Sequence, residues 1–492
     1  MLLLVPALLL FAANAPRDIC DAQTLAECID QRIEARLAQA GIQPAPLADD
    51  AEFFRRLSLD LNGRIPSLTQ LIDFLDDRRP NKRRLWIDEL LDGRDNAPLY
   101  IDHFTNLWRR RVLANTQPQP PSVVGTLEVW LRRKLQAGAP YDDIARGLLT
   151  DEGAIGFRRA NEDKPEKLTA ATARLLLGLK LECAQCHDHP FARWKRKQFW
   201  QYAAFFSTPR EGRPRLRIGD SGAFVEASFL DGSEPNWKGR TVPRVALAEW
   251  IARADNPWFA RAAVNRVWQD LLGVGLVNPV DGLGMADNPA SHPELLDELA
   301  WQFAAHKFDT KYLLRAVVGS RTYQRSSRPA VPGRSEDVRL FARATVRALS
   351  GEQLRDSVLV ATGNLPQDGA PTGTSLGGTT LQGEFVALFE DTQASPIESS
   401  ASMQQALAMM NSRFISEVTK PANSPTLAAA ISRSARPAAR QIEDLYLVVL
   451  SRRPRPDETV RLVKYVEGRA TSTALADVLW ALLNSTEFVV NH

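Results

Sequence analysis

Apolar side chains recur at helical spacing along most of the chain, and this pattern limits the fold more than any other feature. Phe53, Phe54, Leu57 and Leu61, for example, share one helical face. Ser67, a few residues further on, is a typical N-cap for the next helix. Because stretches of the same kind follow one another to the end of the chain, the sequence predicts a mainly α-helical fold.

One segment departs from the helical pattern. In residues 213–230 apolar and polar residues alternate around a Gly-Asp-Ser-Gly turn, which is typical of a β-hairpin. A stretch with glycine and proline follows at 231–243 and indicates a domain boundary. We also expect a short strand at 385–389.

The predicted architecture is two helical domains with a small β-hairpin near their junction. Its parts are a signal peptide at 1–15, an N-terminal segment at 16–46, a first helical domain at 47–208, a hairpin and linker at 209–242, and a second helical domain at 243–492.

The N-terminus is typical of an exported protein. An apolar run from Leu2 to Phe11 is followed by Ala13-Asn14-Ala15, a small-x-small cleavage pattern. No other stretch approaches the roughly 18 apolar residues that a membrane-spanning helix needs. We therefore expect a signal peptide, a periplasmic or secreted location, and no transmembrane segment beyond the signal peptide.

The charge balance excludes one class of partner. The chain has 61 basic and 58 acidic residues, so its net charge is +3. Such a balance lacks the strong positive charge that binds nucleic acid, and we expect no nucleic-acid partner. The sequence leaves the oligomeric state open.

The most specific motif is Cys183-Ala184-Gln185-Cys186-His187. Two cysteines separated by two residues and followed directly by histidine form the pattern of covalent c-type haem attachment. In this interpretation Cys183 and Cys186 attach one haem c and His187 is an axial ligand of the iron. A zinc site, a redox dithiol and a simple disulfide stay open as alternatives. His189 becomes a fourth donor only in a non-haem metal site, where adjacent Cys186 and His187 are awkward partners for one tetrahedral ion.

The two other cysteines, Cys20 and Cys28, lie close together near the start of the expected mature chain. In an oxidising compartment they are candidates for a local disulfide. The alternative is two free thiols in a helix.

Several further segments together resemble a known family. The sequence resembles the planctomycete-type paired-domain proteins, in which a cytochrome-like domain of unknown function precedes a companion C-terminal domain of unknown function. The segments that carry the resemblance to the first domain are RRLSLDLNGRIPS (55–67), KRRLWIDELLDG (82–93) and LLGLKLECAQCHDHPFARWKRKQFWQYAAFFS (176–207). Those of the second are ALAEWIARADNPWFARAAVNRVWQDLLGVGLV (246–277), SHPELLDELAWQF (291–303), SRTYQRSS (320–327), ALSGEQLRDSVL (348–359), SMQQALAMMNSRFI (402–415) and LLNSTEFVVNH (482–492).

The resemblance implies export and a cytochrome-like first domain, and it carries no activity with it. Ala192 departs from the acidic residue that the family often has before Arg-Trp. His292, where the resemblance places a histidine and Pro293 restricts the turn, is our candidate for a sixth iron ligand. A capping or core role is the alternative for His292. Weaker candidates are methionines that more often pack in a core: Met285, Met403, Met409 and Met410.

No hydrolase or nucleotide-binding motif is present: there is no G-x-S-x-G, P-loop, H-E-x-x-H or G-x-G-x-x-G. Acidic pairs at Asp142/Asp143 and Glu390/Asp391 could serve acid–base work on a glycan, although solvated surface is the alternative. The first hypothesis is an exported c-type haem protein that transfers electrons to a periplasmic redox partner. The alternatives are a haem-free binding or scaffold protein with a metal or disulfide at Cys183/Cys186, and an extracellular polysaccharide-processing component.

Overall fold

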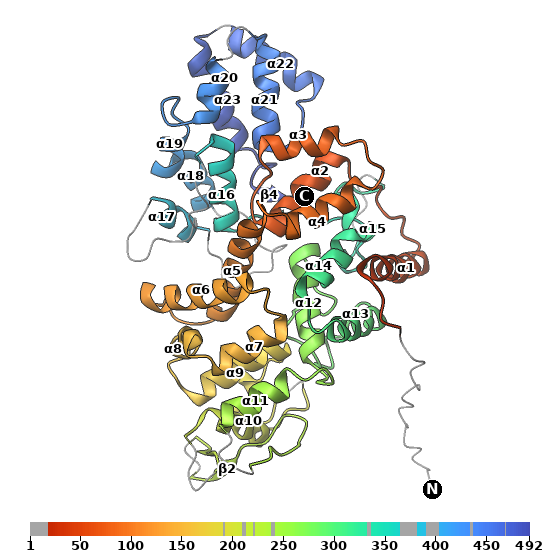
Figure 1. Ribbon diagram of the computed structural model, residues 1–492, viewed down its shortest axis with the longest axis vertical. Coiled ribbons are helices and arrows are strands. Elements are labelled where there is room, and N and C mark those ends of the chain that lie inside the picture. The colour runs from red at the N-terminus through yellow and green to blue at the C-terminus, as the bar shows by residue number, and fades with distance from the viewer. Residues whose placement is uncertain are drawn as a thin grey trace.

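In the computed structural model most of the chain folds into helices of two to five turns (Figure 1). The structure describes residues 18–189, 192–208, 213–219, 222–237, 242–331, 336–364, 381–389, 403–432, 436–467 and 469–492. The predicted signal peptide at 1–15 lies outside these ranges. The fold is mainly α, as the sequence predicts, and the described part has two small antiparallel strand pairs.

The elements up to the hairpin contain the first family-like segments. They are α1 (Ala22–Ala40), α2 (Asp50–Asn62), α3 (Leu68–Asp76), α4 (Lys82–Asp92), α5 (Ala97–Leu113), α6 (Pro121–Gln136), α7 (Tyr141–Thr150), η1 (Glu152–Ala154), α8 (Ile155–Ala160), α9 (Pro165–Leu177), η2 (Glu182–Gln185), α10 (Arg196–Ala203), η3 (Ala204–Phe206), β1 (Arg215–Arg217) and β2 (Phe224–Glu226). Strands β1 and β2 pair antiparallel with Leu216 opposite Val225, so the predicted hairpin is confirmed.

The second half is also helical. Its elements are α11 (Pro243–Ile251), α12 (Phe259–Leu272), α13 (Pro293–Ala305), α14 (Thr310–Gly319), α15 (Arg321–Gln324), η4 (Val338–Leu340), β3 (Arg347–Ala348), α16 (Gly351–Thr362), α17 (Leu381–Ala387), α18 (Met403–Asn411), α19 (Arg413–Val418), α20 (Pro425–Ser432), α21 (Ala438–Leu450), α22 (Pro456–Glu467), α23 (Thr471–Leu483) and β4 (Val490–Asn491). The strand expected at 385–389 is wrong, because Phe385 is in helix α17 and packs against Phe414.

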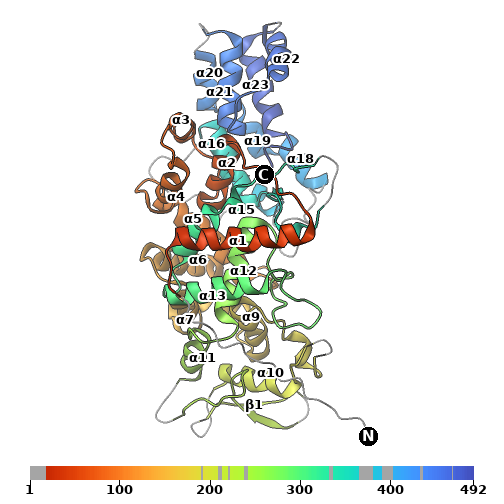
Figure 2. The same ribbon diagram turned by 90° about the vertical axis from the view of Figure 1, so that its right-hand side faces the viewer.

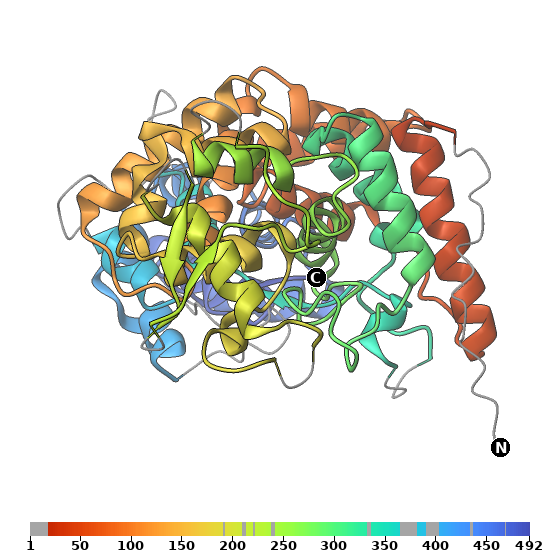
Figure 3. The ribbon, with the colours of Figure 1, turned by 90° about the horizontal axis from the view of Figure 1, so that it is seen from below.

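The molecule is elongated, with the hairpin at one end of the long axis and α20–α23 at the other (Figures 1 and 2). Helix α1 crosses the middle of the body, and the view from the hairpin end shows it along one edge (Figures 2 and 3). No helix in the described ranges is long and apolar enough to cross a bilayer.

Two hydrophobic cores divide the chain at a different place from the glycine- and proline-bearing linker. The first core contains residues from Leu25 to Ala342, among them Val225, Ala227 and Leu230 of the hairpin segment, together with Leu447. The second contains residues from Leu349 to Phe488, together with Leu59 and Ile65. The segment that the sequence marks as a linker contributes to the first core through Trp237, whose ring centroid lies 6.1 Å from that of Phe205. Aromatic area buried in this way stabilises the junction, so packing continues across it.

Helix α2 connects the two cores. Its Phe53 and Phe54 belong to the first core, whereas Leu59 belongs to the second. The helix is therefore buried on nearly all sides, including its charged residues Arg55 and Asp60. A buried charged side chain requires partners, and these partners come from the other end of the chain.

Candidate functional site

The C-x-x-C-H segment follows the tightly held end of helix α9. Gly178 caps this helix with φ 64°, and its carbonyl oxygen accepts a hydrogen bond from the backbone N–H of Leu283 at 3.0 Å. Leu179 forms a β-bridge with Gly282. A Cβ at position 178 would lie 2.7 Å from Leu283 Cδ1. Glycine is therefore required both by the left-handed backbone and by the close approach.

The motif directs its functional side chains outward. Cys183, Cys186 and His187 are exposed, whereas Ala184 is completely buried and His189 is buried. The 3-10 turn η2 has Cys186 as its cap, and residues i and i+3 of such a turn lie on the same side. The two thiols therefore share an accessible side of the turn, and the exposed imidazole follows directly in the chain.

Hydrogen bonds from the following helix hold the turn in place. Trp200 Nε1 donates to the carbonyl oxygen of Gln185 at 3.0 Å, and the backbone N–H of Arg196 donates to Asp188 Oδ1 at 2.9 Å. Lys195 Nζ is 3.1 Å from Asp188 Oδ2. The backbone N–H of Arg196, followed by Lys195, lowers the pKa of Asp188. The backbone around the motif is thus tied to α10 while its side chains face solvent.

His187 is held in one orientation. Its Nδ1 lies 2.7 Å from the carbonyl oxygen of Asp188. A carbonyl oxygen only accepts hydrogen bonds, so Nδ1 is the protonated nitrogen and Nε2 carries the lone pair in the neutral ring. A histidine that ligates a metal commonly donates its other ring N–H to a carbonyl or carboxylate in this way.

The aromatic residues after the motif belong to the core. Trp194, Phe199, Trp200, Tyr202 and Phe205 are all buried. They pack among themselves and against residues of the junction and α11, including stacked and edge contacts that involve Phe229, Trp250 and Trp258. Their area is already used in internal packing, so they do not form an open wall beside the two cysteines.

The other side chains predicted as metal ligands or disulfide partners do not lie with the exposed cysteines and histidine of the motif. Within the described residues, no group of three or more His, Cys, Asp or Glu side chains is arranged to hold a metal ion. His189 is buried while the other three donors of the zinc alternative are exposed. Cys20 and Cys28 are free thiols in this structure, and burial raises the pKa of both. The disulfide between them stays a prediction.

His292 lies at the N-cap of α13 and is buried. Its Nδ1 is 3.0 Å from Ser291 Oγ, its ring lies against Phe341, and its Nε2 has no partner in the described chain. Burial lowers the pKa of His292 to about 4. These contacts fit the core alternative, since the side chain makes no capping hydrogen bond to α13. Among the methionines considered as ligands, Met409 is buried, Met403 and Met410 are exposed on α18, and Met285 is half-buried.

Of the two acidic pairs considered for glycan chemistry, the first forms ion pairs with basic side chains and the second lies outside the described residues. Asp142 forms an ion pair with Arg146 at 2.5 Å, and Asp143 with Lys134 at 3.0 Å. Residues 390 and 391 lie outside the described ranges.

A second site forms where segments far apart in sequence meet, and sequence reasoning missed it. Asp60 in α2 accepts hydrogen bonds from Arg347, Tyr323 and Asn491 at 2.7–2.9 Å. Arg56 donates to the carbonyl oxygens of Tyr323 and Arg325. The segments 55–67, 320–327 and 482–492 that carry the family resemblance therefore converge. The sequence held one signal for this site. In the helix predicted to bury Phe53, Phe54, Leu57 and Leu61, the charged residues Arg55, Arg56 and Asp60 stand directly between these apolar residues.

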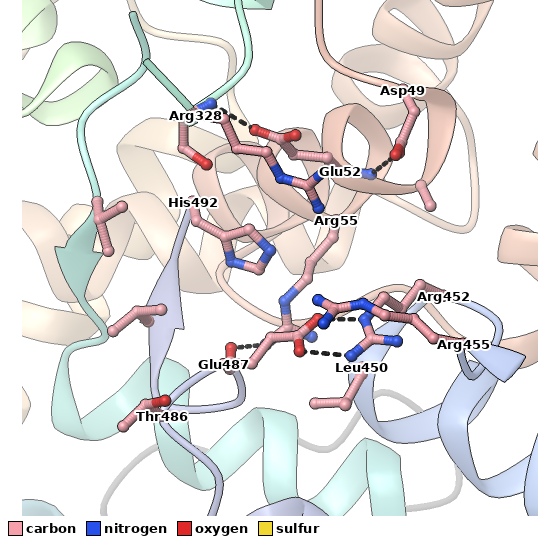
Figure 4. Close-up of a pocket in the computed structure, with 14 residues that line it drawn as sticks. Asp49, Glu52, Arg55, Arg328, Leu450, Arg452, Arg455, Thr486, Glu487 and His492 are labelled. Atoms are coloured by element: carbon pink, nitrogen blue, oxygen red, sulfur yellow. Dashed lines mark hydrogen bonds and ion pairs between the residues drawn. The ribbon is translucent and has the colours of Figure 1, made fainter. Parts of the chain in front are cut away.

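Beside this convergence lies a cavity of about 360 Å³ (Figure 4). It is lined by α2, the segment after α15, the residue before β3, the end of α21 and the last residues of the chain. Its lining residues are Asp49, Ala51, Glu52, Arg55, Ser327, Arg328, Val346, Leu450, Arg452, Arg455, Thr486, Glu487, Val490 and His492.

The fold and the first site define a mainly helical protein with an exposed C-x-x-C-H turn. Residues 28–211 match the family described as PSCyt2, protein of unknown function (DUF1549), and residues 243–377 match PSD1, protein of unknown function (DUF1553). In this order the two matches form the paired-domain arrangement of planctomycete-type proteins, and the chain belongs to that family. No curated protein and no solved structure matches the chain.

Proposed function

We propose that this chain is an exported c-type haem protein that transfers electrons to a periplasmic or extracellular redox partner. Cys183 and Cys186 would hold the haem through thioether bonds, and His187 would ligate the iron. Each thioether forms when a thiol adds across a haem vinyl group: the sulfur bonds to one vinyl carbon and the proton goes to the other. Bound in this way, the haem supplies one-electron transfer.

The observation that carries the proposal is the tautomer of His187, that is, which of its ring nitrogens carries the proton. Its Nδ1 donates to the carbonyl oxygen of Asp188, which leaves the Nε2 lone pair available on an exposed side chain directly after Cys186. The chemistry of the donor set therefore fits the attachment motif. Lys195 and Arg196 support the fit. They bind the carboxylate of Asp188 and thereby hold in place the residue whose carbonyl oxygen accepts the hydrogen bond from His187.

The test is expression with export in a host that carries a c-type haem maturation system. We expect a Soret band that survives acid-acetone extraction, since thioether-linked haem stays with the protein. The double variant Cys183→Ser/Cys186→Ser should lose the band. The matched control Cys20→Ser/Cys28→Ser removes the same number of thiols elsewhere and should keep it. Correctly exported, folded protein without covalent haem would sink the proposal.

His187 has its own test. His187→Ala should retain the covalently bound pigment, because the thioether bonds do not involve the imidazole. Its visible spectrum and reduction potential should change, because the iron loses a strong nitrogen ligand. An unchanged spectrum would show that His187 is not a ligand.

A haem-free binding or scaffold role is the second candidate. The observation that favours it is the burial of the described aromatic side chains after the motif, Trp194 to Phe205, which are therefore not available to wall a haem beside the two thiols. It is supported if Cys183→Ser/Cys186→Ser lowers the unfolding temperature while the exported wild-type protein shows no Soret band.

A further inference from the structure

The cavity beside α2 has acidic and basic side chains in nearly equal number, but their partners differ. Glu52 is bound by Arg56 at 2.8 Å, by Ser326 Oγ at 3.0 Å and by the backbone N–H of Ser327 at 2.7 Å. Asp49 caps α2 by accepting from the backbone N–H of Glu52. Each of these carboxylates is thus engaged by the protein itself.

The third carboxylate of the lining is engaged as well. Glu487 and Arg452 form a two-point ion pair at 2.5 and 2.8 Å, and Arg452 also binds Glu458 at 2.9 and 3.0 Å. Arg452 is therefore already neutralised by two carboxylates. Neither residue of this pair has charge left for a ligand.

Arg55 is in a different situation. Its side chain is almost completely buried at the cavity, yet its described hydrogen bonds go to carbonyl oxygens, those of Val449 at 3.1 Å and Phe488 at 3.0 Å, with Glu487 O more distant at 3.4 Å. Its Nε has no partner within the described chain. The charge of Glu487 attracts this guanidinium without a direct ion pair between the two side chains, so this attraction and the carbonyl dipoles only partly offset the cost of desolvation. This residue leaves a positive charge at the cavity.

Two more guanidinium groups add to this positive side, and one imidazole nitrogen adds a further hydrogen-bonding group. Arg328 and Arg455 line the cavity, are exposed, and form no ion pair with any carboxylate of the described ranges. His492 Nδ1 is buried and has no partner among the described residues. Figure 4 shows its ring between Arg328 and Glu487, pointing into the space that the side chains enclose.

We propose that this cavity is a binding site for a small oxyanion, a carboxylate, sulfate or phosphate group, held by Arg55, Arg328 and Arg455 with His492 as a further hydrogen-bond partner. Guanidinium forks match the paired oxygens of such groups. The volume of about 360 Å³ accepts an anion carried by a small organic molecule as well as the free ion. The site is independent of the C-x-x-C-H turn, which lies towards the hairpin end of the long axis (Figure 1).

The test is isothermal titration calorimetry of the full chain at constant ionic strength with sodium sulfate, phosphate, acetate and glucuronate, and with glucose as the neutral comparison. We expect saturable binding of at least one anion and none of glucose. Binding of sulfate or phosphate identifies the free inorganic group as sufficient, whereas binding of glucuronate alone assigns the site to an organic carboxylate.

The variants separate a built site from general attraction to a basic surface. Arg328→Ala and Arg455→Ala change exposed side chains and should each weaken binding about tenfold or more. Arg133→Ala, an exposed arginine on α6, is the matched control and should bind like the wild type. Absence of anion binding in the folded wild-type chain, or equal weakening by all three substitutions, would overturn the proposal.

Discussion

Replacing Asp60 with asparagine should destabilise the protein strongly, although the two side chains have the same shape. Asp60 is buried, with its side chain 3% exposed, and it accepts from Arg347 at 2.9 Å through both oxygens. Tyr323 and Asn491 donate to it at 2.8 and 2.7 Å. These partners come from α15, β3 and β4, so the interaction joins the beginning of the chain to its end.

The magnitude follows from the bonds that asparagine cannot accept. An amide has one acceptor oxygen, so one neutral hydrogen bond worth about 1 kcal/mol is lost. The charge-assisted bond to Arg347 also weakens, by about 1.5–3 kcal/mol. The expected loss in the free energy of unfolding is therefore about 2.5–4 kcal/mol, close to the general cost of removing one partner of a buried pair.

Equilibrium unfolding in urea at pH 7, followed by circular dichroism, measures this loss. The control is Asp255→Asn, because Asp255 pairs with Arg253 at 2.5 Å where both side chains are more than half exposed. We expect the control to change the free energy of unfolding by less than about 1 kcal/mol. If Asp60→Asn costs no more than the control, the convergence at Asp60 does not stabilise the fold and the reasoning is refuted.

Three further predictions concern pH and backbone conformation. Hydrogen bonding to Arg452 lowers the pKa of Glu458 to about 2, so this pair stabilises the fold above the ordinary pKa of 4.5 and the contribution is lost as the pH falls towards 2. Glu458→Gln should therefore flatten the acid-unfolding curve in that range while costing less than about 1 kcal/mol at pH 7. Burial lowers the pKa of His292 from 6.5 to about 4, so the unfolded chain takes up the proton first and stability falls as the pH drops through that interval; His292→Asn should remove this slope in thermal melts. Gly178→Ala, at φ 64° and with a leucine methyl 2.7 Å from the new Cβ, should cost about 2–4 kcal/mol in urea unfolding, whereas Gly41→Ala, at φ 65° in open space, should cost about 1. Equal losses at the two glycines would contradict the role given to close packing at the end of α9.

Much of the fold could be predicted from local sequence. Ser67 caps α3 by accepting from the backbone N–H of Gln70, as its position before an apolar run indicates. The hairpin is also where the alternation at 213–230 predicts it. The two-residue pairing of β3 with β4 could not be predicted. Nothing in the residues around Ala348 indicates that Val490 is its partner, or the reverse.

The candidate sites divide in the same way. The spacing of Cys183, Cys186 and His187 identifies the attachment motif, but only the structure shows that these side chains are exposed while Ala184 is buried. The structure also shows that the aromatic residues after the motif, Trp194 and Phe199 among them, are buried in the core. His292 was considered as a ligand, and in the structure its ring packs against Phe341 and its Nδ1 contacts Ser291 Oγ.

By itself the sequence determined the mainly helical architecture, the positions of caps and hairpin, and the motif that defines the proposed haem site. These features depend on residues within a few positions of one another, and helical periodicity and capping act over that range. Only the tertiary structure decided that one core continues through the predicted linker, that Asp60 meets Arg347 and Asn491, and that Arg55 is buried at a cavity where it donates to carbonyl oxygens. Burial and pairing of charges depend on segments hundreds of residues apart, and no local pattern contains that information.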